Sequence, residues 1–254
     1  SYYEGLTSYP AARCVRILNP LSADLNVMRQ TLLFNTMEAV QLNANRRNGN
    51  LRLYEFGNCY FYDEAARDAE KPLSAYSEQY RLAIAVTGAA VPQSWNAKPQ
   101  ASSFFTLRAV AEKLLRRFGL DIYALKCDPL QSDLFGDGIS LSAGNGRELL
   151  QMGVVAPRIR RAFDLKQEVY YLEMNFDALV KSTRKHRIAF EELSKFPEVK
   201  RDLALLVDRQ VTFAQLRAIA LATERKLLKS VSLFDVYEGD KLPESKKSYP
   251  LSFV

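Results

Sequence analysis

The sequence has few of the residues that most often carry catalysis or bind metals. Its 254 residues include one histidine, one tryptophan and three cysteines. Cys14, Cys59 and Cys127 are too far apart to form a zinc motif, and an odd number argues against a disulfide framework. We therefore expect the three thiols to pack in the core of a protein from a reducing, cytoplasmic compartment.

Long apolar runs and phosphate-binding motifs are also absent. No run approaches 18 apolar residues, so we expect no membrane-spanning helix. Neither GxxxxGK[ST] nor GxGxxG occurs. His186 lies in a basic stretch, where a general base would have no positioned partner. With 48% hydrophobic and 25% charged residues, the composition is that of one large or two ordinary globular domains, which excludes disordered and collagen-like chains.

Positive charge is concentrated near the end of the chain. The net charge is +6, and residues 181–254 alone carry 15 Lys or Arg against 10 Asp or Glu. A basic surface favours a polyanionic partner such as RNA, although an excess of five charges is also ordinary for a globular domain.

Residues 1–190 predict a mixed domain built on an antiparallel or mixed sheet. Apolar residues at steps of three and four predict a helix over 25–45, capped by Ser22 or Asp24. A second helix follows a cap at Ser102 or Ser103 and ends at Gly119. Gly57 indicates a bend or a close backbone approach in a strand. The other expected elements are strands over 51–62, 80–87 and 169–175, short strands within 121–155, a short helix over 157–163, and loops over 64–78 and 91–99.

A second unit is predicted after a linker at about 181–197. The expected elements are a strand over 202–207, a helix over 212–228 capped by Thr212, and strands over 230–237 and 247–254. This β-α-β-β order opens a ferredoxin-like module. Because the chain starts at Ser1 and ends inside a strand at Val254, we expect a piece of a longer protein, in which the module lacks its last helix and strand.

Basic and aromatic residues surround the small sheet of this second unit. Single-stranded RNA is commonly held by stacking on aromatic rings beside a basic surface. Strand alternation puts Phe234 and Tyr237 on opposite faces, so at most one of them is a base platform. We expect Phe234 to lie in the core.

Several segments resemble one family. FPEVKRDLALLVD (196–208) and KSVSLFDVYEGDKLPESKKSYPLSFV (229–254) resemble the ferredoxin-fold anticodon-binding domain that closes the β subunit of bacterial phenylalanyl-tRNA synthetase. NPLSADLNVMRQTLL (19–33), LRLYEFGNCYF (51–61), FFTLRAVAEKLLRRFGL (104–120) and RAFDLKQEVYYLEMNFDAL (161–179) resemble the catalytic-like module that precedes it.

The resemblance implies an α+β fold with two domains. Residues 1–190 would form a class II synthetase-like antiparallel sheet with flanking helices, and residues 195–254 the truncated anticodon-binding domain. The whole enzyme would be an (αβ)2 ligase that uses ATP and Mg2+ to charge phenylalanine tRNA, with the active site on the α subunit. This chain would be a non-catalytic scaffold, inactive alone, with no catalytic residue, metal site or bound cofactor. The helix over 25–45 would contact the α subunit, or would pack entirely within its own domain.

The resemblance also implies which residues contact RNA in the second domain. We expect the four cations to touch the tRNA backbone and the two tyrosines to stack on bases: Lys200, Arg201, Arg217, Lys246, Tyr237 and Tyr249.

One segment suggests that ATP chemistry has been lost. Active class II domains carry a GxxFRxE strand, whose Arg holds the ATP α-phosphate. In the similar stretch here, from Gly57 to Asp63, Phe61 takes the Arg place. An aromatic ring cannot donate paired hydrogen bonds to phosphate. The class II helix motif with an ATP-stacking Arg is not recognisable near 145–180 either.

Two other interpretations remain open. The chain could be a free-standing tRNA- or protein-binding module without a synthetase partner. An independent ATP-using enzyme is disfavoured by Phe61.

Overall fold

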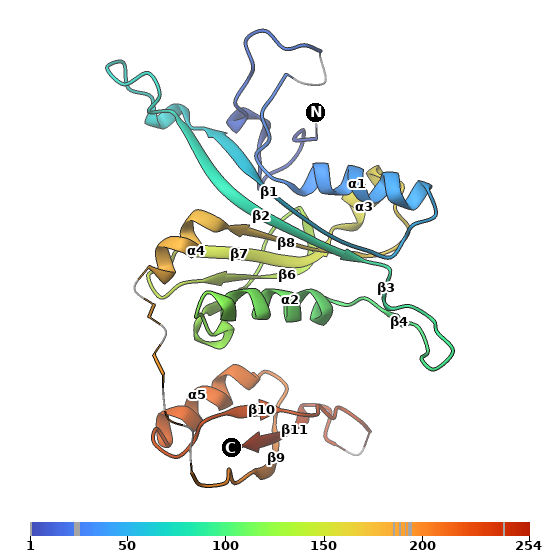
Figure 1. Cartoon of the computed structure of the whole chain (residues 1–254), viewed down its shortest axis with the longest axis vertical. Coiled ribbons are helices and arrows are strands. Elements are labelled where there is room, and N and C mark those ends of the chain that lie inside the picture. The colour runs from blue at the N-terminus through green and yellow to red at the C-terminus, as the bar shows by residue number, and fades with distance from the viewer. Residues whose placement is uncertain are drawn as a thin grey trace. The chain divides into compact units, whose positions relative to one another are not determined.

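Figure 1 shows a computed structural model of the whole chain, which describes residues 2–22, 26–184, 186–187, 189–190, 192, 195–240 and 242–254. The chain forms two compact units, Ser1–Ile188 and Ala189–Val254, and each has its own sheet. Within the described ranges, no helix combines the length and the apolarity needed to cross a membrane.

The first unit is built on a six-stranded antiparallel sheet in the order β1-β2-β8-β7-β6-β5 (Figure 1). Its strands are β1 (Leu51–Tyr62), β2 (Tyr76–Thr87), β5 (Lys126–Pro129), β6 (Phe135–Ser142), β7 (Glu148–Val155) and β8 (Val169–Asn175). β1 and β8 have the predicted bounds. β2 begins four residues before its predicted start, because residues 76–79 continue the pairing with β1. A separate hairpin joins β3 (Ala89–Val91) to β4 (Gln100–Ala101).

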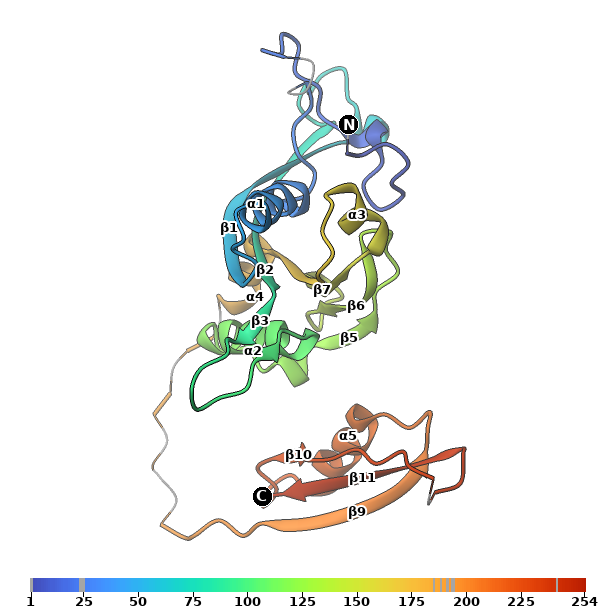
Figure 2. The same cartoon turned by 90° about the vertical axis from the view of Figure 1, so that its right-hand side faces the viewer.

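Helices cover both faces of this sheet (Figure 2). α1 (Leu33–Asn45) and α3 (Pro157–Ala162) pack on one face, and α2 (Phe104–Arg117) and α4 (Phe176–Thr183) pack on the other. Side chains alternate along β2, so that Ala83 joins the α1 core and Leu82 joins the α2 core. Single-turn 3-10 helices occur at Ala11–Arg13, Glu64–Ala66 and Ile122–Ala124. The sheet is therefore apolar on both faces.

The first long helix starts eight residues later than predicted. Of its expected first turn, Asp24 and Leu25 lie outside the described residues, and Ser22 caps no helix. The backbone before the helix is engaged elsewhere: the Met28 N–H donates to the Val15 carbonyl at 2.9 Å, and the Tyr60 N–H donates to the Arg29 carbonyl at 2.8 Å. These long-range bonds hold the segment extended, and periodicity alone could not reveal them.

The second long helix follows its local signals. The Ser103 side chain accepts from the Thr106 N–H in a capping box, and Gly119 follows the helix with φ of +77°, as predicted for the Ser102 or Ser103 cap and for the Gly stop. The predicted helix at 157–163 is also present as α3. We did not predict α4, whose Asn175 cap accepts from the Ala178 N–H.

The second unit has the predicted β-α-β-β order. Its elements are β9 (Arg201–Asp208), α5 (Phe213–Thr223), β10 (Val231–Leu233) and β11 (Lys246–Phe253), and the antiparallel sheet runs β10-β11-β9. Thr212 caps α5 through a capping box with Gln215, as predicted.

Two elements of this unit are shorter than predicted because acidic side chains bind the backbone at their ends. α5 stops before Leu228, where the Glu224 carboxylate accepts from the N–H groups of Lys226 and Leu227. β10 stops before Tyr237, where the Asp235 carboxylate accepts from the Val236 N–H at 2.8 Å. Such local bonds compete with helix and strand ladders.

Candidate nucleic-acid interface

The six residues predicted to contact RNA all lie in the second unit. They occupy the approach to β9, the two ends and the middle of the β9–β11 pair, the β10–β11 connection and α5: Lys200, Arg201, Lys246, Tyr249, Tyr237 and Arg217. The structure therefore distributes them over the unit and does not bring them into one cluster.

Lys200 lies beside an exposed aromatic ring. Its Nζ is 6.0 Å from the ring centre of Phe234, which is 57% exposed. The expectation that Phe234 lies in the core was wrong, because β10 ends at Leu233 and the strand alternation does not continue. Lys200 also lies 3.9 Å from Asp202, an exposed pair of little energetic consequence. The two side chains together offer a base-stacking face and a cation.

The other strand cations lie at opposite ends of the β9–β11 pair. Lys246 is opposite Asp208 and donates to its carboxylate at 2.7 Å, whereas Arg201 is opposite Phe253. Seven residues of strand separate the two ends, about 23 Å at 3.3 Å per residue. A single nucleotide cannot touch both ends, so these cations would contact an extended backbone.

The two predicted stacking tyrosines differ in accessibility. Tyr237 is 41% exposed, and its backbone exchanges two hydrogen bonds with Ser248. Its ring lies over Gly239, where an added Cβ would meet the hydroxyl at 2.3 Å. Tyr249 is 8% exposed, with the Nζ of Lys247 at 4.5 Å from its ring centre. In this conformation Tyr237 presents part of its ring, and Tyr249 has no free face.

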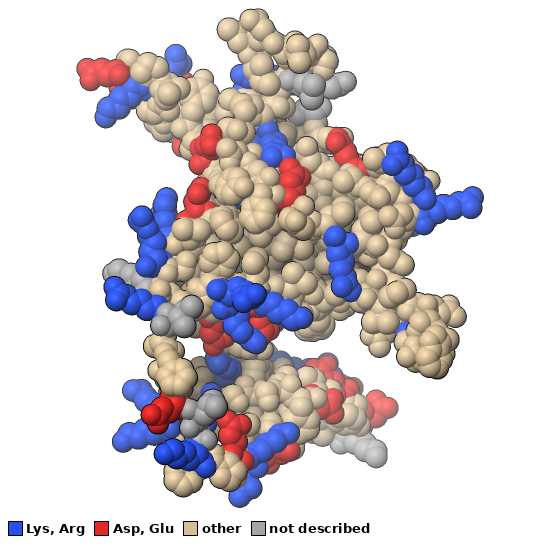
Figure 3. Space-filling model, in the orientation of Figure 1, with Lys and Arg blue, Asp and Glu red and all other residues tan. Residues whose placement is uncertain are grey.

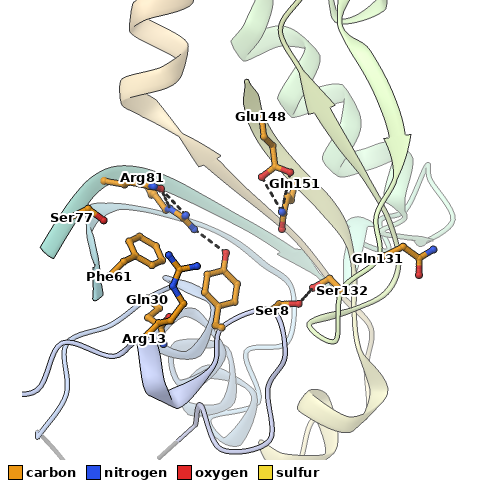
Figure 4. Close-up of a pocket in the computed structure, with 12 residues that line it drawn as sticks. Ser8, Arg13, Gln30, Phe61, Ser77, Arg81, Gln131, Ser132, Glu148 and Gln151 are labelled. Atoms are coloured by element: carbon orange, nitrogen blue, oxygen red, sulfur yellow. Dashed lines mark hydrogen bonds between the residues drawn. The ribbon is translucent and has the colours of Figure 1, made fainter. Parts of the chain in front are cut away.

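The first unit contains a polar cavity of about 290 Å³ (Figure 4). Phe61 forms part of its wall, and the Arg81 guanidinium lies 5.2 Å from the centre of that ring. Arg81 donates to the Tyr9 hydroxyl at 3.0 Å and pairs with the Glu173 carboxylate. An arginine thus reaches the neighbourhood of Phe61 from β2, although the motif-like stretch from Gly57 to Asp63 contains none.

The carboxylate of Glu173 is the centre of a buried network. It accepts from Thr31 and Tyr171 hydroxyls, each at 2.5 Å, and from the Leu32 N–H at 3.1 Å. Burial and the Glu173 charge raise the pKa of Tyr171 well above its usual range. Burial acts to lower the pKa of Arg81, but the Glu173 carboxylate and Tyr9 outweigh it and raise that pKa. Arg81 therefore remains charged and bound to Glu173 and Tyr9.

The cavity lining does not fit a magnesium nucleotide. Phe61 cannot bind phosphate, and of the two lining arginines Arg81 is neutralised by Glu173, which leaves Arg13 alone for a phosphate. The lining supplies a single carboxylate, that of Glu148. Hard divalent cations with phosphates prefer several oxygen donors. Throughout the described part of the chain, no group of three His, Cys, Asp or Glu side chains is placed to hold a metal.

The sequence predicts structural positions, and no catalytic role, for the three cysteines, His186 and Gly57. Cys14 and Cys59 are buried, and burial raises the pKa of Cys59 to about 12. Cys127 is exposed on the terminal strand of the sheet, so the expectation that it packs in the core was wrong. His186 is exposed, with its ring against Gly119. At Gly57 the predicted close approach is by a side chain, because an added Cβ would lie 2.0 Å from the Arg29 guanidinium.

Two family models match the chain. Residues 2–176 match the phenylalanyl tRNA synthetase beta chain CLM domain, and residues 194–254 match the ferredoxin-fold anticodon binding domain.

Curated relatives match over the full length of the chain. It is 47% identical over 254 residues to the phenylalanine–tRNA ligase beta subunit of Bacteroides fragilis and 48% identical to that of Bacteroides thetaiotaomicron. Each alignment covers 100% of this chain and 31% of the relative, so the chain spans about a third of their length. Among solved structures, a pyrrolysyl tRNA synthetase of Desulfitobacterium hafniense is 15% identical with a TM-score of 0.47, covering 66% of this chain and 52% of that one.

Proposed function

The chain belongs to the phenylalanyl-tRNA synthetase β chain family, and we propose that it is a non-catalytic part of a phenylalanine–tRNA ligase. Residues 1–190 are a class II synthetase-like scaffold for an α subunit. Residues 195–254 are a ferredoxin-type domain that binds the anticodon region of phenylalanine tRNA. The whole enzyme is a cytoplasmic (αβ)2 ligase, and ATP and Mg2+ act on the α subunit.

The pairing of Lys200 with the exposed Phe234 ring carries the tRNA-binding part of this proposal. An unstacked base can lie on an exposed ring while a neighbouring ammonium binds phosphate. Arg201 extends this group along β9, and Lys246 and Tyr237 supply contacts further along the unit. Arg217 on α5 and the buried Tyr249 remain predictions on sequence grounds.

The apolar stripe of α1 does not supply the contact with an α subunit. The apolar stripe of α1 packs inside its own unit, since Leu33, Met37 and Val40 are completely buried. Of the two uses expected for this helix, intradomain packing therefore accounts for the stripe.

We place the α-subunit contact at the β1 edge of the sheet, on the face that also carries α2 and α4. Tyr54 is 76% exposed on the edge strand, next to Phe56 and Tyr80, whose rings stack at 5.9 Å. A contiguous exposed aromatic patch is typical of a protein–protein interface.

Fluorescence anisotropy with labelled phenylalanine tRNA tests the RNA-binding role. Phe234→Ala should weaken binding by about 1–3 kcal/mol, which is the usual loss for a stacked base. Lys200→Glu should weaken binding and reduce its salt dependence. Leu73→Ala, at an exposed apolar site in the first unit, is the control and should bind like the unaltered chain. Equal affinity of all four proteins would contradict the assignment.

Gel filtration with light scattering tests the scaffold role. A mixture of the chain and the α subunit from the same source should contain a stable complex, and the Tyr54→Glu/Phe56→Glu variant should lose it. Leu42→Glu, at a 52% exposed position on α1, is a control for a carboxylate placed at another exposed apolar site and should retain the complex. Absence of any complex at micromolar concentration, together with intact tRNA binding, would favour a free-standing tRNA-binding module.

A further inference from the structure

Basic side chains gather in the first unit where two helices end. Lys113, Arg116 and Arg117 lie in the last turns of α2, and Lys181 and Arg184 lie at the end of α4; we call these five residues the α2–α4 basic patch. All five are exposed. Figure 3 shows Lys and Arg side chains over this part of the first unit.

Two contacts connect α2 and the segment after it with α4 and the segment after it. The ring of Phe118, which follows α2, meets the ring of Phe176 at the start of α4 with centres 5.8 Å apart. His186, shortly after α4, lies against Gly119. On α2, Lys113 and Arg117 are one turn apart and therefore lie on the same side of the helix. The contact between Gly119 and His186 therefore brings the chain that follows α2 next to the chain that follows α4, and the five cations lie on the residues around it.

Few acidic side chains neutralise this surface. Glu112 pairs with Arg116 at 2.7 Å. Asp177 lies at the opposite end of α4 and accepts from the Tyr80 N–H at 3.0 Å. Asp121 accepts from the Tyr123 N–H at the same distance. Across the described residues, the other four cations of the patch form no ion pair with a carboxylate.

Helix stability does not account for the whole patch. A cation in the last turn of a helix gains about 0.3–1 kcal/mol from the helix dipole. This interaction with the helix dipole accounts for the positions of three cations, each in the last turn of its helix: Arg116, Arg117 and Lys181. Lys113 lies a full turn earlier, and Arg184 follows the helix, so neither is needed for this purpose.

We propose that the α2–α4 basic patch binds the sugar–phosphate backbone of RNA, as a second contact for the tRNA that the proposed function assigns to the other unit. Charge complementarity favours a polyanion. The aromatic rings at this site, Phe118 and Phe176, are partly buried against each other and offer no free stacking face. The contact is therefore with phosphates and carries no base specificity of its own.

Salt dependence provides a quantitative test. Each phosphate neutralised by Lys or Arg contributes about 0.7–0.9 to the slope of log K against log salt. The triple variant Arg117→Glu/Lys181→Glu/Arg184→Glu should lower the slope by about 2.1–2.7, three times that contribution. Between 50 and 200 mM salt, the variant should then lose about 20- to 40-fold less affinity than the unaltered chain.

A matched variant controls for net charge. Arg46→Glu/Lys71→Glu/Lys98→Glu makes the same change at three exposed positions on other elements. Both triple variants and the unaltered 254-residue chain are titrated into fluorescein-labelled phenylalanine tRNA, after circular dichroism has shown equal helix content and equal thermal midpoints. Retention of the original slope by the control, with a reduced slope for the patch variant, supports the proposal.

The other outcomes separate this proposal from the proposed function. If the two triple variants behave alike while Lys200→Glu still weakens binding, the patch does not bind RNA and the anticodon-domain assignment stands. If the unaltered chain binds no tRNA at any salt concentration, the proposed function fails first. If poly-glutamate displaces tRNA from the patch at equal charge concentration, the surface binds acidic polypeptides and the RNA assignment is overturned.

Discussion

Glu173→Gln should lower the stability of the first unit more than any substitution on its surface does. Its carboxylate accepts from Arg81, Thr31, Leu32 and Tyr171, and its side chain is 6% exposed. Glutamine keeps the shape, removes the negative charge and turns an NH2 group toward groups that are themselves donors. The guanidinium of Arg81, 14% exposed, is left as a buried charge without an anionic partner.

The expected loss follows from that isolated charge. Removing one partner of a buried ion pair typically costs about 3–5 kcal/mol. For a unit of this size, each kcal/mol lowers the melting temperature by about 2–4 °C, so Glu173→Gln should lower it by about 6–20 °C. Differential scanning calorimetry of the chain measures this, because the transition of the first unit is the one that moves.

A double variant tests whether the isolated Arg81 charge causes the loss of stability. Arg81→Met/Glu173→Gln has no unpaired charge and should recover at least about half of the lost stability. A shift below about 2 °C for Glu173→Gln, or a double variant less stable than Glu173→Gln alone, would refute the view that the isolated guanidinium dominates the loss.

Three further predictions concern stability. Burial raises the pKa values of Cys59 and Tyr3 to about 12 in the folded chain. The contribution of their neutral forms to the free energy of unfolding is therefore complete below about pH 9 and is lost as the pH rises toward 12. In the Cys59→Ala variant, the free energy of unfolding should fall less steeply with alkaline pH, by about 1.4 kcal/mol per pH unit. Gly153→Ala should destabilise by about 1–3 kcal/mol or more in urea unfolding, because its Cβ would lie 2.2 Å from a backbone oxygen of β6, whereas Gly144→Ala meets nothing within 4 Å and should be neutral. Thr212→Ala removes the capping box of α5, and the melting temperature of the second unit should fall by an amount equivalent to about 1 kcal/mol.

Elements whose causes lie in neighbouring residues were predictable from the sequence. The caps at Ser103 and Thr212 and the stop at Gly119 depend on side chains and backbone within a few positions, and all three are observed. The start of α1 depends instead on backbone bonds to residues far away in the chain, such as that between Tyr60 and Arg29. No local pattern contains that information.

The same distinction applies to the candidate sites. Lys200 is predictable from composition and from resemblance, but the exposure of its neighbour Phe234 is not. Phe234 is exposed because β10 ends before it, and that end depends on a local bond to the Asp235 carboxylate. The position of Arg81 near Phe61 follows from the pairing of β1 with β2, and the register of that pairing is not readable from either strand. The α2–α4 basic patch likewise requires α4, a helix that was not among the elements expected from the sequence.

In the first unit, buried paired charges stabilise the fold, and exposed unpaired charges are available to bind a partner. In the cavity of the first unit, Arg81 is buried and neutralised by Glu173, so its charge stabilises the fold and is not available to a ligand. On the surface, Lys181 and Arg184 are exposed and form no ion pair within the part of the chain that the structure describes, so their charges cost little stability and remain available to a partner. Substitutions in the cavity should therefore lower the melting temperature without changing the tRNA affinity of the folded chain, and substitutions in the patch should do the reverse. Both properties can be measured on the same set of variants, and a cavity variant that folds normally but loses tRNA binding would show that this separation is wrong.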